Sequence, residues 1–201
     1  MYKRFWKRFI DTLLSLIAFI ILSPLLLITA LAVKISSPGP VLFKQQRLGL
    51  HGKVFTIYKF RSMTDGAEHT GSGVYSGKGD ARVTKVGKII RATSIDELPQ
   101  LFNIIKGDMS VVGPRPERPE LTEKYEREMP EFKFRLKVKA GLTGYAQVTG
   151  VYDTTPYDKL KMDLMYIERY SMVMDLRIIL MTIKTMISPG EMNSEADKEK
   201  Y

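Results

Sequence analysis

An uncharged segment near the start of the chain constrains the fold more than any other feature. It runs from Thr12 to Val33, 22 residues without a charged side chain. A straight helix of that length would be about 33 Å long, at about 1.5 Å per residue, which is enough to cross the apolar core of a bilayer. No small-residue cleavage site follows it, so we expect the segment to remain on the mature chain.

The dipeptide Ser23-Pro24 interrupts this segment near its middle. Proline lacks a backbone N–H and clashes with the preceding turn, so the sequence predicts a kink between two half-length helices. The Ser23 hydroxyl is a candidate partner for a carbonyl that the kink frees. Two interpretations stay open: a single-pass helix with a proline kink, and a helix–break–helix that enters and leaves the same face of the membrane. A buried core helix is less favoured, because a small domain rarely buries so uniform an apolar cylinder.

Basic residues stand on both sides of the uncharged segment, and such residues mark the cytoplasmic flanks of membrane segments. They are Lys3, Arg4, Lys7 and Arg8 before it, and Lys34, Lys44 and Arg47 after it. The re-entrant form accounts for a cytoplasmic signal on both flanks, and the single-pass helix stays open beside it.

Composition narrows the class of protein. The 201 residues suit one modest domain with an appendage, and 31 Lys and Arg against 22 Asp and Glu give a net charge of +9. That charge points to a polyanionic partner: nucleic acid, anionic lipid or a phosphorylated substrate. Because the chain has no cysteine and only two histidines, a disulfide scaffold, a thiolate or histidine metal cluster and a cysteine nucleophile are excluded.

The remaining pattern predicts an α+β fold that is mainly helical. Two short strands, Val41–Phe43 and Val54–Phe60, flank a turn at Gly49–Gly52 and form a small hairpin. Helices are expected over Lys85–Arg91, Ser94–Lys106, Glu117–Met129, Thr155–Tyr170 and Leu176–Ile187, the last capped by Asp175. The stretches 65–80 and 138–150 are expected to be loops, and the glycines of the first do not fit a phosphate-loop pattern. We therefore expect three parts: a membrane helix over 1–36, a main domain over 37–190, in which any catalytic residues would lie, and a polar disordered tail over 191–201.

Two adjacent carboxylates are the most informative chemical feature. Ser94 and Glu97 have the spacing of a capping box, which would place Asp96 and Glu97 in the first turn of a helix. One interpretation is that both carboxylates simply offset the positive end of that helix. The other is that they hold a divalent cation and offer a nucleophile to a phosphate, which a carboxylate cannot approach without a cation nearby.

Basic side chains accompany this pair. Arg115 stands between Pro114 and Pro116, which would hold its guanidinium in a defined place for bidentate phosphate binding. Lys59 and Arg61 share one face of the second strand. A structural salt bridge for Arg115 and a solvated strand end for Lys59 and Arg61 stay open. The apolar stripe of Leu176–Ile187 suits either a membrane interface or the core.

Several longer motifs together resemble one family. They are Lys85–Arg91, Ser94–Asn103, Gly107–Pro116 and Gly141–Gly144, in that order along the chain. These segments resemble the bacterial sugar transferases, the small monotopic phosphoglycosyl transferases, and the likeness extends from the N-terminal segment to about Ile187. The resemblance implies transfer of a phosphosugar from a nucleoside diphosphate sugar, usually a UDP-sugar, to polyprenol phosphate, with release of UMP. This sugar-1-phosphate transfer would be the first membrane step of glycoconjugate biosynthesis, such as exopolysaccharide, capsule, O-antigen or a glycoprotein glycan.

The resemblance also implies roles for individual residues. Asp96 would attack the sugar-bearing phosphate and form an aspartyl ester, and Glu97 together with Asp96 would bind Mg²⁺. The phosphate-neutralising residues would be Arg91, Arg115, Lys59 and Arg61. Ser23-Pro24 would be the break of a re-entrant membrane helix. The protein would then act at the cytoplasmic face of the bacterial inner membrane, with lipid, a UDP-sugar and polyprenol phosphate as partners, no nucleic acid, and a second copy or downstream glycosyltransferases as further partners.

Other functions remain to be separated from this one. Tyr58–Arg61 alternates aromatic and basic side chains, as single-strand binding surfaces do, so a membrane-tethered basic module without catalysis is the main alternative. A glycosyltransferase that releases UDP is another. The leaving nucleotide distinguishes these three functions.

Overall fold

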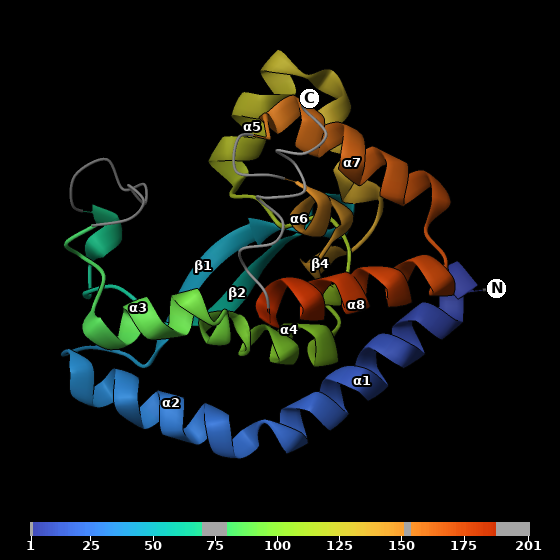
Figure 1. The fold of residues 1–201 in the computed structure, drawn as a ribbon. Coiled ribbons are helices and arrows are strands. Elements are labelled where there is room, and N and C mark those ends of the chain that lie inside the picture. The colour runs from blue at the N-terminus through green and yellow to red at the C-terminus, as the bar shows by residue number, and fades with distance from the viewer. Residues whose placement is uncertain (1, 70–79, 151–153, 188–201) are drawn as a thin grey trace, which may run out of the picture.

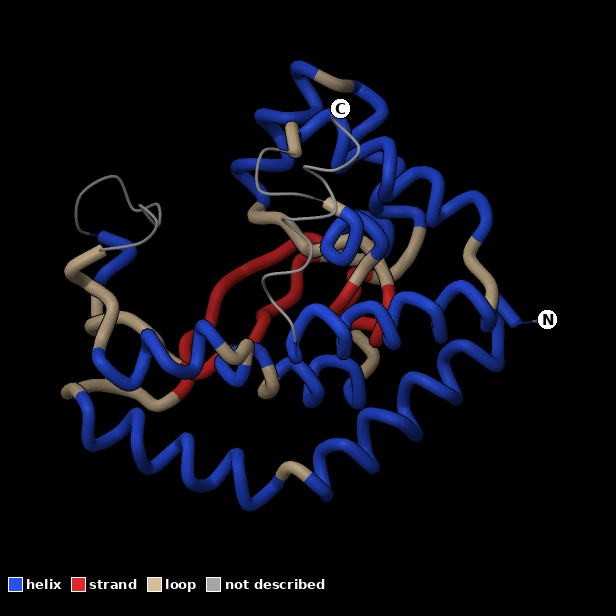
Figure 2. Tube along the Cα trace, viewed as in Figure 1, coloured by secondary structure: helices blue, strands red, loops and turns tan. Residues whose placement is uncertain are grey.

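The computed structural model describes residues 2–69, 80–150 and 154–187, and the mainly helical α+β class is confirmed in them (Figures 1 and 2). The α-helices are α1 Lys7–Ile21, α2 Ser23–Ser36, α3 Lys85–Ala92, α4 Gln100–Lys106, α5 Pro119–Glu128, α6 Tyr145–Thr149, α7 Pro156–Arg169 and α8 Met172–Ile187. The strands are β1 Leu42–Leu48, β2 Val54–Phe60, β3 Met109–Val112 and β4 Ala140–Thr143. Shorter helical turns are η1 Tyr2–Trp6, η2 Leu50–Gly52, η3 Ala67–His69, η4 Ile95–Glu97 and η5 Pro130–Lys137. Most of the expected 65–80 loop and all of the expected 191–201 tail lie outside the described residues.

The predicted kink is present between α1 and α2. The two helices bend by 64° at the break. Pro24 cannot donate to the carbonyl of Ile20, and the Ser23 hydroxyl donates to that oxygen instead, at 2.8 Å. Among the described residues, no unbroken helix has the length and apolarity to cross a bilayer, whereas the bent pair together meets both criteria.

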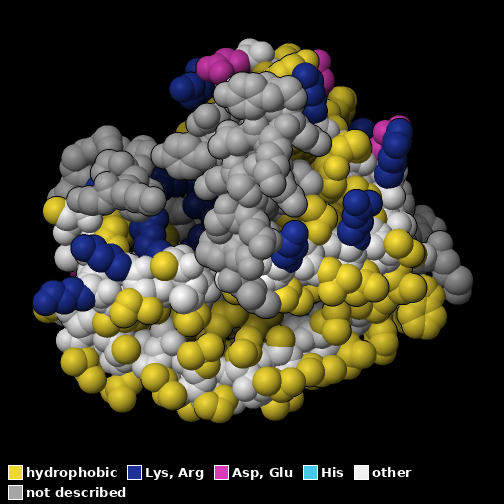
Figure 3. Space-filling view, viewed as in Figure 1, with side chains coloured by type: hydrophobic (Ala, Val, Ile, Leu, Met, Phe, Trp, Pro, Cys, Tyr) yellow, Lys and Arg dark blue, Asp and Glu magenta, His cyan; other side chains and the backbone are white. Residues whose placement is uncertain are grey.

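Hydrophobic side chains cover the outer side of this bent pair, which we call the apolar floor. Its exposed members are Phe9, Leu13, Leu16, Ile17, Ile20, Ile21, Leu27, Ile28, Leu31 and Ile35. They lie along the lower edge of Figure 3, and Leu27 and Ile35 are 72% and 77% exposed. A contiguous apolar surface of this kind marks a membrane or protein contact rather than a water-facing side.

The expected apolar stripe of Leu176–Ile187 is divided in the structure. Leu176, Leu180 and Ile183 are exposed, whereas Ile179 packs against the core. The expectation that Asp175 caps this helix is wrong, because α8 begins at Met172 and the Asp175 carboxylate is buried. Lys7 lies 2.6 Å from that carboxylate, so Asp175 joins the start of the chain to α8.

Charged residues of α1 hold the floor against the rest of the protein. The Arg8 guanidinium donates to the carbonyls of Ile104 and Ile105 in the last turn of α4, where helix carbonyls need partners from outside the helix. The buried Asp11 accepts from the Ser110 hydroxyl at 2.7 Å and from the Val111 N–H at 3.1 Å. Arg8, one of the basic residues that flank the uncharged segment, therefore binds backbone carbonyls of α4.

The predicted hairpin is confirmed, with a longer first strand than expected. β1 and β2 are antiparallel, from Leu42 opposite Phe60 to Leu48 opposite Val54. The fully buried Asn103 of α4 completes the free edge of β2. Its amide nitrogen donates to the Thr56 carbonyl at 2.7 Å, and its amide oxygen accepts from the Tyr58 N–H at 3.1 Å. These bonds fix α4 beside the hairpin.

The expectation of a loop over 138–150 is wrong, because this stretch forms β4 and α6. β4 pairs in parallel with β3, with Met109 opposite Ala140 and Val112 opposite Thr143. Two glycines allow a close approach here, Gly141 within β4 and Gly113 just after β3: a Cβ on Gly141 would lie 2.1 Å from the backbone nitrogen of Gly113. Parallel pairing joins segments distant in the chain, so local periodicity does not reveal it.

Asn103 provides a test of this architecture. Replacing Asn103 with Ala leaves two buried backbone groups of β2 without partners, and we expect the free energy of unfolding to fall by about 2–4 kcal/mol. Thermal or urea unfolding in detergent solution measures the change. Lys124→Ala, at an exposed position of α5, is the matched control and should leave stability unchanged. Equal stability of the Asn103 and Lys124 variants would contradict the role assigned to the amide.

Candidate active site

Asp96 and Glu97 lie in the η4 turn rather than in the first turn of an α-helix. The capping box predicted at Ser94 is wrong: Ser94 adopts a left-handed conformation, with φ of 56°, and its side chain caps nothing. Pro99 has no N–H for the Ile95 carbonyl, and the Leu98 N–H donates to that oxygen instead, so a 3₁₀ turn precedes α4. The two carboxylates thus occupy a separate turn between α3 and α4.

Two cations hold Glu97. Its Oε1 atom lies 2.7 Å from the Lys59 Nζ and 2.7 Å from an Arg115 guanidinium nitrogen. Burial alone would raise the pKa of Glu97, but Arg115 and Lys59 outweigh it and lower this pKa to about 2. Glu97 therefore remains a carboxylate throughout the physiological range.

Asp96 has the opposite environment. Among the described residues, no group donates a hydrogen bond to its carboxylate. Burial and then the neighbouring Glu97 charge raise the pKa of Asp96 to about 6, against the opposing effect of Lys59, Arg91 and Arg115. Two adjacent carboxyl groups whose pKa values are separated in this way have different chemical roles: Glu97 is an anchored anion, and Asp96 is a group whose oxygens are open to a reactant.

Hydrogen bonds fix the backbone around Arg115, as its flanking prolines predict. Three consecutive carbonyls around it each accept a hydrogen bond. The Gly141 N–H donates to Pro114 at 2.9 Å, Arg135 donates to Arg115 at 2.9 Å, and Arg47 donates to Pro116 at 3.0 Å. The salt bridge left open for Arg115 is present, and its partner is Glu97.

The structure brings together most, but not all, of the predicted basic residues. Arg91, in the last turn of α3, lies close enough to Asp96 to lower its pKa, and Lys59 and Arg115 contact Glu97. Arg61 is directed elsewhere. Its buried guanidinium donates to the carbonyls of Ser37 and Pro38, so the expectation that it projects beside Lys59 toward a phosphate is wrong. Arg61 instead fixes the linker that follows α2.

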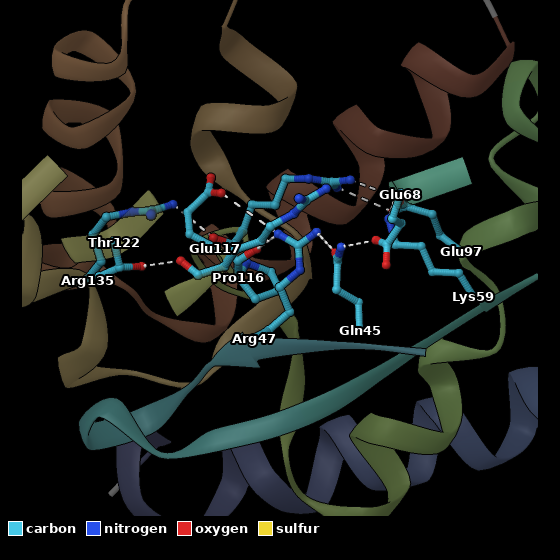
Figure 4. A network of polar contacts seen from close by, with 11 residues as sticks. Gln45, Arg47, Lys59, Glu68, Glu97, Pro116, Glu117, Thr122 and Arg135 are labelled. Atoms are coloured by element: carbon cyan, nitrogen blue, oxygen red, sulfur yellow. Dashed lines mark hydrogen bonds and ion pairs between the residues drawn. The ribbon is translucent and has the colours of Figure 1, made fainter. Parts of the chain in front are cut away.

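Two arginines that sequence reasoning missed support the site (Figure 4). Arg47, which the sequence suggested as a membrane flank, is directed to Pro116 and lies 3.9 Å from Glu117. The two-residue period of β1 places it on one face with Gln45, to which it donates, and this was the available signal. Arg135 pairs with the buried Asp163 at 2.8 Å, and no local pattern marks it.

A cleft of about 620 Å³ lies beside these residues. Its walls come from α5, η5, α6, α7 and the segment that carries Arg115 and Glu117. Figure 3 shows Lys and Arg side chains gathered above the apolar floor. Arg115 borders both the cleft and the carboxylate pair.

The carboxylate pair is also the candidate metal site. Within the described residues, no group of three or more acidic or histidine side chains could hold a metal ion. Asp96 and Glu97 alone still suit Mg²⁺, which protein sites often bind through one or two carboxylates together with substrate phosphates. The open oxygens of Asp96 fit this mode, and the two cations on Glu97 leave fewer oxygens there for a metal.

Comparison with known proteins agrees with the motifs. The family profile described as bacterial sugar transferase matches residues 2–189. The UDP-N-acetylgalactosamine-undecaprenyl-phosphate N-acetylgalactosaminephosphotransferase of Aeromonas hydrophila is 44% identical over 92% of this chain and 44% of its own length. The UDP-glucose:undecaprenyl-phosphate glucose-1-phosphate transferase of Klebsiella pneumoniae is 44% identical over 89% of this chain and 39% of its own length.

Relatives of different lengths share this region. The chain spans less than half of the two transferases above, but 96% of the exopolysaccharide production protein PSS of Rhizobium leguminosarum, at 42% identity. The matched region includes the bent helix pair, the Asp96-Glu97 turn and Arg115. The chain therefore belongs to the bacterial sugar transferase family.

Proposed function

We propose that the protein transfers a phosphosugar from a UDP-sugar to polyprenol phosphate and releases UMP. The observation that carries this proposal is the carboxylate pair: Glu97 is fixed by Lys59 and Arg115, while Asp96 is left open beside them. The names of the relatives, two of which use undecaprenyl phosphate and different UDP-sugars, support the substrate class. They do not select one sugar, since N-acetylgalactosamine and glucose relatives are 44% identical to the chain alike.

Asp96 is the nucleophile in this proposal. A carboxylate oxygen attacks the sugar-bearing phosphorus, the bond from that phosphorus to the bridging oxygen breaks, and UMP leaves with the electron pair. The phosphosugar is then bound to Asp96 as an acyl phosphate. An oxygen of polyprenol phosphate attacks the same phosphorus, the bond to Asp96 breaks, and the carboxylate is restored as polyprenyl diphosphate sugar forms. Two displacements let the two anionic substrates react one after the other.

The surrounding cations reduce repulsion between Asp96 and the phosphates. Lys59, Arg91 and Arg115 carry positive charge around Asp96 and lower its pKa. Mg²⁺ bound through Asp96 and Glu97 would supply further charge neutralisation at the phosphates. Glu97 has a second role in this arrangement, because its bonds keep the Lys59 and Arg115 heads beside Asp96.

The apolar floor is the proposed membrane contact. We infer that α1 and α2 enter one leaflet and return, which places both ends of the pair and the catalytic part on the cytoplasmic side of the inner membrane. The 64° bend, the exposed apolar side chains on both helices and the basic residues on both flanks support this topology. A polyprenol phosphate in the same leaflet would then present its phosphate near the carboxylate pair.

The absence of cysteine makes the topology testable. The variants Lys3→Cys and Lys53→Cys each introduce a single cysteine, one before and one after the helix pair in sequence. We expect a membrane-impermeant maleimide to label neither in intact spheroplasts and both after permeabilisation, because a re-entrant pair returns the chain to its starting side. Labelling of the Lys3 position alone in intact cells would show a single span.

The nucleophile is tested by substitution and by trapping. Asp96→Asn should lower UMP release by at least about 1,000-fold, since the amide cannot form the ester, with Glu123→Gln on α5 as a control of normal rate. Wild-type protein given donor without acceptor should gain the mass of one phosphosugar, and peptide mapping should place it on Asp96. A fully active Asp96→Asn protein, or an adduct on another residue, would remove Asp96 from this role.

The pH dependence follows from the raised pKa of Asp96. Only the ionised carboxyl group can attack, so the rate should fall as pH decreases through about 6, approaching about tenfold per pH unit below it. Lys59→Gln removes a charge that lowers this pKa, so its acidic limb should move to higher pH, while Lys53→Gln on the hairpin turn should leave it in place. The initial rate of UMP release across pH 5–8 measures both. An unmoved limb in the Lys59 variant would contradict the assigned electrostatics.

A further inference from the structure

The 620 Å³ cleft has no role in the chemistry described so far. It lies among α5, η5, α6 and α7, which form the upper part of Figure 1, whereas α1 and α2 of the apolar floor form the lower edge. Its volume is within the range of about 300–1,000 Å³ that small-molecule sites occupy. Arg115 is shared between this cleft and the carboxylate pair, so a molecule in the cleft could extend to Asp96.

The charges at the cleft suit an anionic ligand. Arg115 stands at the end next to Glu97. Lys159 of α7 is exposed at the cleft and forms no ion pair with any described residue. Asp163 is neutralised by Arg135 at 2.8 Å, so it does not cancel Lys159. The remaining acidic residue of the lining, Glu117, lies 3.9 Å from Arg47. Lys159 is therefore left for a phosphate oxygen, and Arg115, which is already paired with Glu97, adds a cation at the border with the carboxylate pair.

Other walls of the cleft suit a planar or sugar-sized group. Tyr125 supplies aromatic surface beside the buried Phe132, with ring centres 5.0 Å apart, and the small residues Ala146 and Gly150 line the cleft from α6 and its end. We infer that this cleft holds the nucleoside diphosphate part of the donor, with its phosphates toward Arg115 and Lys159 and its nucleoside near Ala146. The inference rests on the proposed function, and it adds where the donor binds and which residues determine its affinity.

The polyprenol chain does not suit this cleft. Glu117 and the exposed Lys159 line it, and an apolar chain would take these charged groups out of water without replacing their hydration. Most of the exposed large hydrophobic side chains lie instead on α1, α2 and α8. Donor and acceptor would thus reach Asp96 from different sides.

Arg135 links the cleft to the reacting groups. It pairs with Asp163 of α7 and donates to the Arg115 carbonyl at 2.9 Å, while the Arg115 side chain holds Glu97. The Arg135 side chain therefore connects α7, in the wall of the cleft, to Arg115, which holds Glu97. A donor in the cleft would contact Arg115, the same arginine that holds Glu97.

The decisive comparison uses two lysines on one helix. Lys159→Ala should raise the KM for the UDP-sugar by about tenfold, as expected for loss of one charge-assisted phosphate contact, and leave the KM for polyprenol phosphate unchanged. Lys161→Ala removes the same charge from α7, but Lys161 pairs with Asp158 and lies over the Tyr157 ring, outside the cleft, so donor KM should not change. A second variant, Ala146→Trp, should fill the cleft and weaken UMP binding to the full-length protein in detergent, measured by calorimetry.

Each outcome decides the assignment. Unchanged donor KM in Lys159→Ala together with unchanged UMP affinity in Ala146→Trp would overturn it, while continued UMP release by the wild type would keep the proposed function. A raised KM for polyprenol phosphate in Lys159→Ala would assign the cleft to the acceptor and also overturn it. Should Ala146→Trp melt below the wild type, the UMP affinity of Lys159→Ala compared with that of Lys161→Ala decides the same question. Absence of UMP release from any UDP-sugar by the wild type would instead defeat the proposed function itself.

Discussion

The site depends on the ion cluster in which Lys59 and Arg115 hold Glu97. Two adjacent carboxyl groups in a partly buried turn repel each other, and burial penalises both charges. The two cations resolve this conflict unequally, because they contact Glu97 directly at 2.7 Å and only influence Asp96 from a distance. One carboxyl group is thereby lowered to a pKa of about 2 and the other raised to about 6. Removing either cation would weaken both the anchoring of Glu97 and the ionisation of Asp96.

Hydrogen bonds to backbone carbonyls keep this cluster in place. Pro114, Arg115 and Pro116 present carbonyls to Gly141, Arg135 and Arg47, so segments from three parts of the chain fix one guanidinium. Asn103 joins α4 to the strand that carries Lys59. Arg8 and Asp11 join the apolar floor to the end of α4 and to β3. The apolar floor and the carboxylate turn are therefore connected through α4, which begins just after the turn and whose last carbonyls accept from Arg8.

Local signals predicted what local interactions determine. The kink at Pro24 follows from a missing N–H, the hairpin from a two-residue period, and the helix over Pro156–Arg169 from a proline at its first position, and all are present. The turn at Ser94–Glu97 was misassigned, because the capping-box pattern does not include the effect of Pro99 on the next hydrogen bond. β4 and the role of Arg135 depend on partners distant in sequence, Met109 and Asp163, which no periodicity reveals. The resemblance assigns Arg61 to phosphate, whereas its buried guanidinium donates to the Ser37 and Pro38 carbonyls instead.

The arrangement also gives a physical reason for a covalent route. A donor diphosphate and a lipid phosphate would each bring negative charge to Asp96, and the described cations near it are Lys59, Arg91 and Arg115, two of which already serve Glu97. Holding both substrates at once would place more negative charge there than these groups offset. If UMP departs before the lipid phosphate arrives, the same cations serve each substrate in turn. A cleft on one side of the carboxylate pair and an apolar floor on the other would allow that exchange without either substrate crossing the path of the other.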